Sequence, residues 1–486
     1  MKTAERENPL SKRIMEFEEE EKEPVSPTGQ YLNSSALSLS VLCILESEVP
    51  IDDSPAMTLL KDVFLPINPR FSSLMVAGEN GEKQWKRVEV KLENHLKVPV
   101  FPSGLSPEAY DMYLDDYISK IGMEQLPQSQ PLWEIHIIKY PTSHAAGIVI
   151  FKLHHSLGDG FSLMGALLSC LQRADNPSLP LTFPTVSARL HSNKNNNSIF
   201  RCVSKIFSAV SETVSDFCRS IAKSTLLEDD QTPIRSGNAA AEFGPMTIAT
   251  MTFSLDHIKQ IKTKVDATIN DVVMGIIFLG TRLYMQEMCQ DSSKASSTAL
   301  VLLNTRVFRS YESVKDMVKP NAKTPWGNYI AFLHVPIPEL TDARFANPLE
   351  FVLEAQQIIN GKKNSLACYL TGGLLEILKK VRGPEAAARF IHGTLKNASM
   401  GISNIIGPVE KMALANHPMK GFYFMVVGAP HSLSITIASY MGKLRVAVGA
   451  EKGFIDSQKL TSCIETAFQM ILKTSCEISS TDHINF

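Results

Sequence analysis

Apolar runs of two kinds along the chain predict a mixture of strands and helices. Residues 132–139 and 147–153 are short apolar runs typical of buried strands, and 246–255 alternates between apolar and polar positions. A longer apolar stretch at 270–287 predicts a buried helix. Similar patterns predict strands at 329–337, 422–427, 433–440 and 443–448, followed by a helix at 456–473. The mixture favours an α/β or α+β fold.

The composition is that of a globular protein and excludes several classes. The chain has 486 residues, 44% of them hydrophobic, and 48 Lys and Arg against 50 Asp and Glu give a net charge of -2. At roughly 100 to 200 residues per domain, this length predicts two or three domains. The near balance of charge argues against a nucleic-acid partner, which requires clustered basic residues. The eight cysteines contain no CxxC pair, so we expect neither a zinc site nor a dithiol redox site.

Changes in composition divide the chain into four segments. Residues 1–29 are acidic, then rich in Pro and Gly, and predict a flexible N-terminal tail. Residues 30–186 and 245–486 predict an N-terminal and a C-terminal domain, joined by a connecting segment at 187–244. The charged N-terminus argues against a secretory signal. No apolar run reaches the length of about 18 residues that a membrane-spanning helix requires.

The connecting segment contains an amphipathic helix over residues 200–221. Its apolar face comprises Phe200, Val203, Phe207, Val210, Val214, Phe217 and Ile221, at steps of three and four. This pattern fits a crossover helix packed on a domain, and it also fits a helix that lies in a membrane interface. Glu212 and Asp216 on the charged face weaken the second interpretation.

The most informative segment is the turn predicted between a strand and a helix, His154-His155-Ser156-Leu157-Gly158-Asp159-Gly160. Adjacent side chains at a strand end point in opposite directions, which disfavours a shared metal site for the two histidines. Ser156 lacks the Gly-x-Ser-x-Gly surroundings of a nucleophile elbow. A single His can instead act as a general base towards a hydroxyl, amine or thiol. Asp159 would orient the imidazole or pin the turn by pairing with a basic group, and Gly158 and Gly160 would allow the tight turn.

The segment HHSLGDG resembles the His-His-x-x-x-Asp-Gly signature of CoA-dependent acyltransferases and peptide-synthetase condensation domains. Other segments resemble, in the same order, those of the plant-type bifunctional wax ester synthase/diacylglycerol acyltransferases. They are PLW at 131–133, NDVV at 270–273, NTR at 304–306, WGN at 326–328 and SNIIGP at 403–408. The resemblance extends from about residue 30 to the C-terminus. The Asp-Phe-Gly-Trp-Gly signature of the plant hydroxycinnamoyl-type acyltransferases is absent.

The resemblance implies a two-domain fold like that of chloramphenicol acetyltransferase, each half a mixed sheet with flanking helices and a tunnel between the halves. It implies His155 as the general base, Asp159 as an orienting or structural residue and His154 as a packing residue behind them. Acyl-CoA would be the co-substrate, with no resident cofactor, and a long-chain alcohol or diacylglycerol the acceptor. The implied location is the endoplasmic reticulum membrane, with the plasma membrane as a second one and the active site facing the cytosol.

Several roles and functions stay open at this point. Asn270 and Asp271 would either cap the helix that follows or line the tunnel. Ser403 and Asn404 would either form a turn or supply a donor to the oxyanion of the reaction. Two other functions remain: an acyltransferase for an amine or another hydroxyl, and a catalytically silent lipid-binding protein of the same fold. The sequence does not rank wax ester against triacylglycerol as the product.

Overall fold

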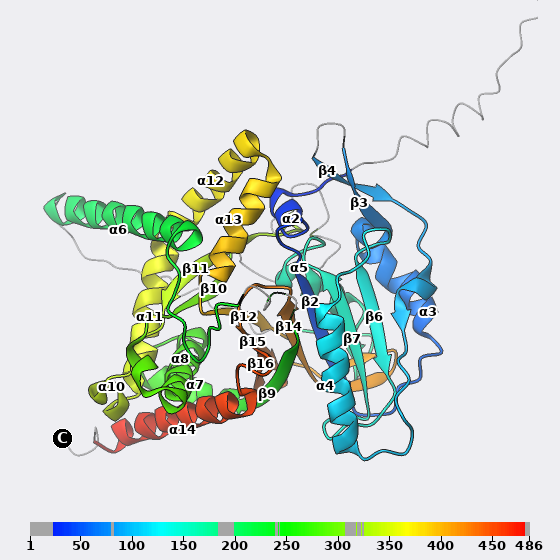
Figure 1. Cartoon of the computed structure of the whole chain (residues 1–486). Coiled ribbons are helices and arrows are strands. Elements are labelled where there is room, and N and C mark those ends of the chain that lie inside the picture. Colours follow the sequence, from blue (N-terminus) through cyan, green and yellow to red (C-terminus); the bar gives the residue numbers. More distant parts are fainter. Residues whose placement is uncertain are drawn as a thin grey trace, which may run out of the picture.

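Two large mixed sheets lie side by side and form the framework of the molecule (Figure 1). A computed structural model of the chain describes residues 23–78, 82–182, 199–238, 242, 244–306, 317, 322 and 325–481, with only the backbone described for 199–210 and 478–481. Within these residues the first sheet has seven strands in the order β5 (Leu96–Lys97), β6 (Trp133–Ile138), β7 (Gly147–His154), β2 (Ser40–Ser47), β14 (His417–Val427), β13 (Met412–Leu414) and β8 (Gln172–Arg173). The second sheet has six strands in the order β11 (Ile330–Pro336), β10 (Thr298–Asn304), β12 (Met400–Ile406), β15 (Leu433–Tyr440), β16 (Lys443–Glu451) and β9 (Met246–Ser254). A small third sheet has the order β1 (Glu23–Pro24), β4 (Lys83–Arg87) and β3 (Ser73–Ala77).

Helices flank both large sheets. They are α2 (Pro27–Tyr31), α3 (Ala56–Leu59), α4 (Pro107–Met123), α5 (Gly160–Ser169), α6 (Ile199–Thr225), α7 (Leu255–Lys264), α8 (Ile269–Met288), α10 (Asp342–Ala346), α11 (Leu349–Asn364), α12 (Ala367–Arg382), α13 (Pro384–Lys396) and α14 (Ser457–Thr481), with short turns η2 (Leu60–Phe64), η3 (Leu65–Ile67), η4 (Pro69–Ser72), η5 (Leu92–Asn94) and η7 (Gln290–Lys294). Helices α7, α8, α11 and α14 pack together on one face of the second sheet (Figure 1). Over the described residues, every helix is too short or too polar to span a bilayer.

The central strands of the first sheet are buried on both faces. Val149 and Phe151 of β7 pack in a cluster with residues of α5 and η2 on one face. Ile148 and Ile150 pack with α4 on the other face. A strand covered on both sides is apolar at successive positions, which explains why residues 147–153 form a continuous apolar run.

The two sheets are joined through β14. This strand belongs to the C-terminal part of the chain, yet it pairs antiparallel with β2 of the first sheet. The chain then turns into β15, which pairs with β12 of the second sheet. The guanidinium of Arg445 on β16 also forms a bidentate ion pair with the carboxylate of Glu46 on β2, with Nη2 2.8 Å from Oε1. Residues 412–427, predicted as part of the C-terminal domain, therefore complete the sheet of the N-terminal half.

The predicted α/β class is confirmed, and the main predicted strands and helices have counterparts in the structure. The predicted flexible tail is wrong at its C-terminal end, because residues 23–29 form β1 and the start of α2. Val25 is only 3% exposed, and Glu23 pairs with Arg70 at 2.5 Å. The composition of this segment did not reveal these contacts, because they depend on residues far along the chain. Residues 1–22 lie outside the described part.

Helix α6 matches the predicted amphipathic helix and extends it at both ends. In its described part the charged side contacts the protein, since Asp216 pairs with Lys362 at 2.9 Å and Lys223 with Asp229 at 2.5 Å. Val214 of the predicted apolar face is exposed. This half of α6 packs on α12 and α13, as the predicted crossover helix would, and it does so partly through its charged side. The side chains of Phe200, Val203, Phe207 and Val210 lie outside the described residues.

Candidate active site

The predicted strand-turn-helix forms around the two adjacent histidines. Strand β7 ends at His154 and helix α5 begins at Gly160. Asp159 is the N-cap of α5, and its Oδ1 accepts a hydrogen bond from the backbone N–H of Ser162 at 3.0 Å. A short acceptor side chain at this position satisfies one of the free N–H groups of the helix end. The Asp of the motif thus fixes where the helix starts.

His155 follows the strand and is held by Asn328 from the other half of the chain. Its Nδ1 lies 3.0 Å from Oδ1 of Asn328, and Nδ2 of the same amide donates to the backbone carbonyl of His155 at 2.9 Å. The carbonyl accepts only, so the NH2 group of Asn328 must face it and Oδ1 must face the imidazole. Nδ1 therefore carries the proton and donates it to Asn328. Nε2 is left with its lone pair, the form that a general base requires.

The surroundings of His155 favour its neutral form. The residue is 4% exposed. Burial lowers the pKa of His155 below the usual value of an imidazole, and the negative charge of Asp159 and the bond to Asn328 offset part of this effect. A histidine with a lowered pKa is unprotonated near neutral pH and is ready to accept a proton.

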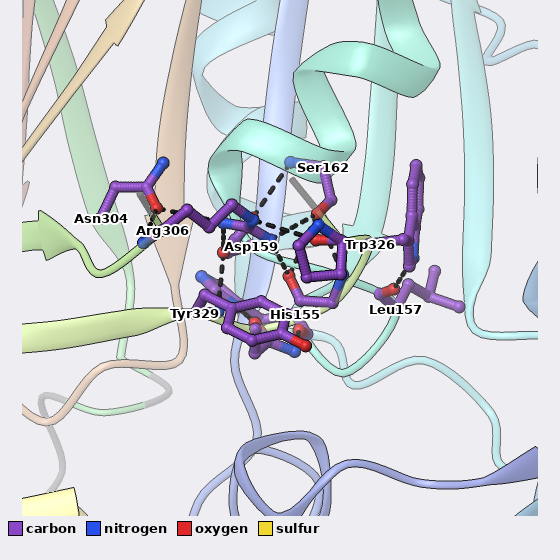
Figure 2. Close-up of polar contacts among 11 residues, drawn as sticks. His155, Leu157, Asp159, Ser162, Asn304, Arg306, Trp326 and Tyr329 are labelled. Atoms are coloured by element: carbon purple, nitrogen blue, oxygen red, sulfur yellow. Dashed lines mark hydrogen bonds and ion pairs between the residues drawn. The ribbon is translucent and has the colours of Figure 1, made fainter. Parts of the chain in front are cut away.

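Asp159 does not contact the imidazole through a hydrogen bond but forms a buried ion pair (Figure 2). Its Oδ2 lies 2.6 Å from Nη1 of Arg306, and both side chains are 1% exposed. The same oxygen accepts from the backbone N–H of Tyr329 at 2.9 Å. Of the two predicted roles for Asp159, pinning the turn to a basic group is the one that the structure shows.

All five N–H groups of the Arg306 guanidinium have an acceptor. They are Oδ2 of Asp159, Oδ1 of Asn304, Oγ of Ser162 and the carbonyls of Pro325 and Gly327, at 2.6 to 3.3 Å. The guanidinium also stacks over the ring of Tyr329 at 4.6 Å. A fully bonded guanidinium has no donor left for a substrate phosphate or an oxyanion. Arg306 therefore joins the motif turn to the segment around residue 327 and takes no direct part in the chemistry.

The two glycines of the motif are explained by close packing. A Cβ at Gly158 would lie 2.9 Å from Cβ of Ser162, and one at Gly160 would lie 3.1 Å from Cδ1 of Ile405 on β12. Trp326 covers Gly158 and donates from its indole Nε1 to the carbonyl of Leu157 at 2.7 Å. Gly160 thus lets the motif turn approach β12 of the second sheet.

His154 points away from His155 and is buried in a separate hydrogen-bond network. Its Nδ1 accepts from the backbone N–H of Ser156 at 3.1 Å, and its Nε2 lies 3.1 Å from the hydroxyl of Ser38. Burial lowers the pKa of His154 to about 3, and the neighbouring His155 adds to the shift. His154 is thus buried in its neutral form, and the packing role that the resemblance implies for it stays a prediction. The Ser156 hydroxyl lies 2.8 Å from the same Nδ1 and is buried.

The four polar residues predicted near the tunnel separate into two groups. Asp271 is buried and forms a capping box with Thr268 at the start of α8, so capping is its role in this structure. Asn270 accepts a hydrogen bond from Nδ2 of Asn404 on β12, and Asn404 is exposed. Ser403 is half-buried beside it. The hydrogen bonds of Asn270, Asp271 and Asn404 described here are made with partners other than His155. An oxyanion role for Asn270, Ser403 or Asn404 stays a prediction.

Sequence reasoning singled out the segments 304–306 and 326–328 but assigned no role to Arg306 or Asn328. Each lies more than a hundred positions from the residue it holds. One sequence contains no signal for such pairs. The only hint is that polar residues and a tryptophan fall in two short segments that share the family order with the motif.

The arrangement of sheets places the chain in a known structural class. The chain is similar to a solved wax ester synthase/diacylglycerol acyltransferase from Marinobacter aquaeolei VT8, with a TM-score of 0.56 and 15% identity over 93% of this chain and 99% of that one. It is also similar to the starter condensation domain of rhizomide synthetase RzmA, with a TM-score of 0.51 and 9% identity over 97% of each chain. The fold is therefore the two-domain mixed α/β fold shared by condensation domains and chloramphenicol-acetyltransferase-like acyltransferases.

Sequence comparisons narrow this class to one family. The wax ester synthase/diacylglycerol acyltransferase catalytic domain matches residues 63–273, and the WS/DGAT C-terminal domain matches residues 326–472. Wax ester synthase/diacylglycerol acyltransferase 5 of Arabidopsis thaliana is 30% identical over 489 residues, which cover 95% of this chain and 96% of that protein. The chain belongs to the wax ester synthase/diacylglycerol acyltransferase family, and the resemblance seen in its motifs is confirmed.

Proposed function

We propose that this protein is an acyl-CoA-dependent O-acyltransferase that esterifies a long-chain alcohol, diacylglycerol or both. Family membership supports the reaction class. The observation that carries the proposal is the hydrogen bond from Nδ1 of His155 to Asn328, which leaves Nε2 as a base. The ion pair of Arg306 with Asp159 supports the proposal further. This ion pair holds the turn that contains His155, and it leaves the imidazole of His155 free of a bond to either residue.

The proposed mechanism is direct transfer without an acyl-enzyme. Nε2 of His155 takes the proton from the acceptor hydroxyl as its oxygen attacks the thioester carbonyl of acyl-CoA. The C–S bond of the tetrahedral intermediate then breaks, the ester forms and the CoA thiolate leaves. The imidazolium returns its proton to that thiolate. Asn328 stabilises the imidazolium state, because its Oδ1 continues to accept from Nδ1–H while Nε2 carries the transferred proton.

Acyl-CoA serves as a co-substrate in this proposal, and no resident cofactor takes part. The two substrates would meet at His155 in a tunnel between the halves of the molecule. The two halves approach each other closely here, because Gly160 packs against Ile405. Since long-chain alcohols and diacylglycerol partition into bilayers, we further propose that the protein associates with a membrane, the endoplasmic reticulum first and the plasma membrane second.

The proposal is tested by incubating the purified full-length chain with labelled palmitoyl-CoA and either hexadecanol or dipalmitoylglycerol. We expect labelled ester with at least one acceptor, together with one free CoA for each ester formed. The ratio of the two products then names the preferred acceptor. CoA release without ester in either reaction, or no turnover with any hydroxyl acceptor, would contradict the proposal and direct the search to amines or to a silent lipid-binding role.

A further inference from the structure

The outer face of α12 carries large apolar side chains where a surface helix normally carries polar ones. Leu366, Tyr369, Leu370, Ile377 and Val381 are 60, 62, 44, 60 and 74% exposed. We call these five residues the α12 face. Leu370 lies four positions after Leu366, Ile377 seven positions after Leu370, and Val381 four positions after Ile377. Tyr369 lies three positions after Leu366, so all five residues share one side of the helix.

The α12 face is long, and among the described residues none covers its centre. From residue 366 to residue 381 a helix extends about 22 Å at 1.5 Å per residue. At Gly372 and Gly373 an added Cβ would meet no atom within 4 Å. Soluble proteins rarely expose contiguous apolar strips of this size, and such strips mark protein or membrane contacts.

The opposite side of α12 contacts the protein through partly buried leucines. Leu375 and Leu378 pack against a cluster that contains Leu39 and residues of α13. The carbonyl of Leu39 accepts the backbone N–H of His155 at 2.8 Å. The α12 face is therefore the outer surface of the same layer that supports the motif turn, at the upper side of the view in Figure 1.

Positive charge flanks the α12 face at its C-terminal end. Lys380 and Arg382 are exposed, and Lys379 pairs with Glu82 at 2.9 Å. Glu376 is the one acidic residue between positions 366 and 382. Basic side chains beside an apolar strip are suited to lipid head groups, since they extend along apolar surface and leave their charge at the polar boundary.

Helix α6 continues this surface. The backbone N–H of Leu366 donates to the hydroxyl of Thr213 on α6 at 3.4 Å, and the next residue, Val214, is 53% exposed. The ion pair of Asp216 with Lys362 fixes α6 to the neighbouring helix α11. An apolar residue of α6 is thereby held near the start of the α12 face.

We propose that the α12 face docks on the surface of an anionic lipid bilayer and that α12 lies in the plane of the interface. This inference rests on the proposed function in one respect, since both proposed acceptors are dissolved in membranes. A bilayer fits a single convex ridge with a basic end, because lipids adapt to its shape, whereas a second copy of the chain would need a matching groove. Anionic lipids also attract nearby Lys and Arg side chains electrostatically.

The test is co-sedimentation of the purified full-length chain with vesicles of phosphatidylcholine containing about a third phosphatidylserine, and with vesicles of phosphatidylcholine alone. We expect wild type to bind the anionic vesicles more tightly. The double variant Ile377→Glu/Val381→Glu should bind at least tenfold more weakly. Val100→Glu/Met112→Glu is the matched control, because it adds the same charge at two apolar residues that are 89 and 70% exposed in the N-terminal half. It should bind as wild type does.

Two further measurements separate this proposal from the proposed function. Lys380→Glu/Arg382→Glu should remove the preference for anionic vesicles. Transfer from a medium-chain acyl-CoA to a water-soluble short-chain alcohol should be equal in wild type and Ile377→Glu/Val381→Glu, since no substituted residue contacts His155. If Ile377→Glu/Val381→Glu loses vesicle binding but wild type has no acyltransferase activity, the docking proposal stands and the proposed function is rejected. Equal vesicle binding by wild type and Ile377→Glu/Val381→Glu would overturn the docking proposal, as would a wild-type dimer that this variant dissociates while neither protein binds vesicles.

Discussion

The turn that carries His155 is polar and buried, whereas the α12 face is apolar and exposed. In the turn, each buried charge or amide has a defined partner: Asp159 has Arg306, and His155 has Asn328. On the α12 face, apolar side chains are in contact with solvent. Both regions reverse the usual distribution of polar and apolar groups in a globular protein.

The buried polar turn and the exposed apolar α12 face differ in how strongly their residues depend on one another. Buried polar groups cost free energy unless every partner is present, so the turn is a closed set of contacts in which few changes are tolerated. The α12 face has no such set, because single apolar residues can be replaced there without leaving a partner unpaired. Changes in the turn should therefore affect catalysis and stability, and changes in the α12 face should affect only location and access to lipid substrates.

Removing the imidazole of His155 should give the largest difference between the two regions, because it should affect catalysis and not vesicle binding. His155→Ala should lower kcat for ester formation by roughly 10²- to 10⁴-fold, the usual contribution of a positioned general base. Binding to anionic vesicles should stay unchanged. His95→Ala is the control, because His95 is 1% exposed and stacks on Trp133 at 4.1 Å on the neighbouring strand. If both variants lose the same activity, the loss reflects structure and the base assignment fails.

Breaking the buried ion pair is the next largest change. Arg306→Met leaves the carboxylate of Asp159 buried without its cation and should lower the free energy of unfolding by about 3 to 5 kcal/mol. Urea denaturation followed by tryptophan fluorescence measures this loss. Asp159→Asn/Arg306→Met removes both charges and should cost less than Arg306→Met alone. The exposed Arg87→Met is the control, and an Arg306→Met protein as stable as that control would show that the ion pair does not hold the turn.

Acid should destabilise the folded protein through buried neutral histidines, one in the motif turn and one on β11 of the second sheet. Burial lowers the pKa of His154 to about 3 and that of His334 to about 4, whereas both titrate near 6.5 in the unfolded chain. Each group contributes stability that is complete above about pH 6.5 and is lost as the pH falls from there towards the folded pKa. At pH 5 the loss is about 2 kcal/mol for each histidine. Denaturation midpoints measured from pH 7.5 to pH 4.5 should fall, and His154→Gln should flatten the decline. A midpoint independent of pH in this range would contradict the burial of neutral histidines.

The smallest effect is expected at the contact between Asn404 and Asn270, which lies outside the set of contacts that holds the motif turn. Asn404→Ala removes a hydrogen bond to Asn270 at an exposed position, worth about 1 kcal/mol at most. We therefore expect kcat to fall less than tenfold, with Asn270→Ala giving the same small change. A loss of about 10²- to 10³-fold in Asn404→Ala alone would instead assign this amide to the oxyanion.

The sequence predicted the strand before the motif and the helix after it, because local apolar patterns decide both. It also predicted that Asp159 would either orient His155 or bind a distant cation, and local pattern could not choose between the two. The partner of His155 lies 173 positions away at Asn328, and only tertiary packing brings it there. The end of the predicted tail was wrong for the same reason, because Val25 is buried by contacts outside its own segment.

The α12 face shows a second limit of sequence reading. Apolar residues at helical spacing predict a helix with an apolar side, and that side normally faces the core. In α12 both Leu378, which packs inward, and Ile377, which is 60% exposed, belong to the same apolar sequence. Which of them faces solvent depends on where α13 and α6 place the helix.

The central claim is that Asn328 holds His155 with its proton on Nδ1 and its base on Nε2. It is tested most directly by the pH dependence of kcat/KM in wild type and Asn328→Asp. A carboxylate beside Nδ1 stabilises the imidazolium, so the acid limb of the profile should move up by about 1 to 3 pH units. Asn94→Asp adds the same charge at an exposed position and should leave the limb in place. An acid limb that does not move in Asn328→Asp would contradict the claim.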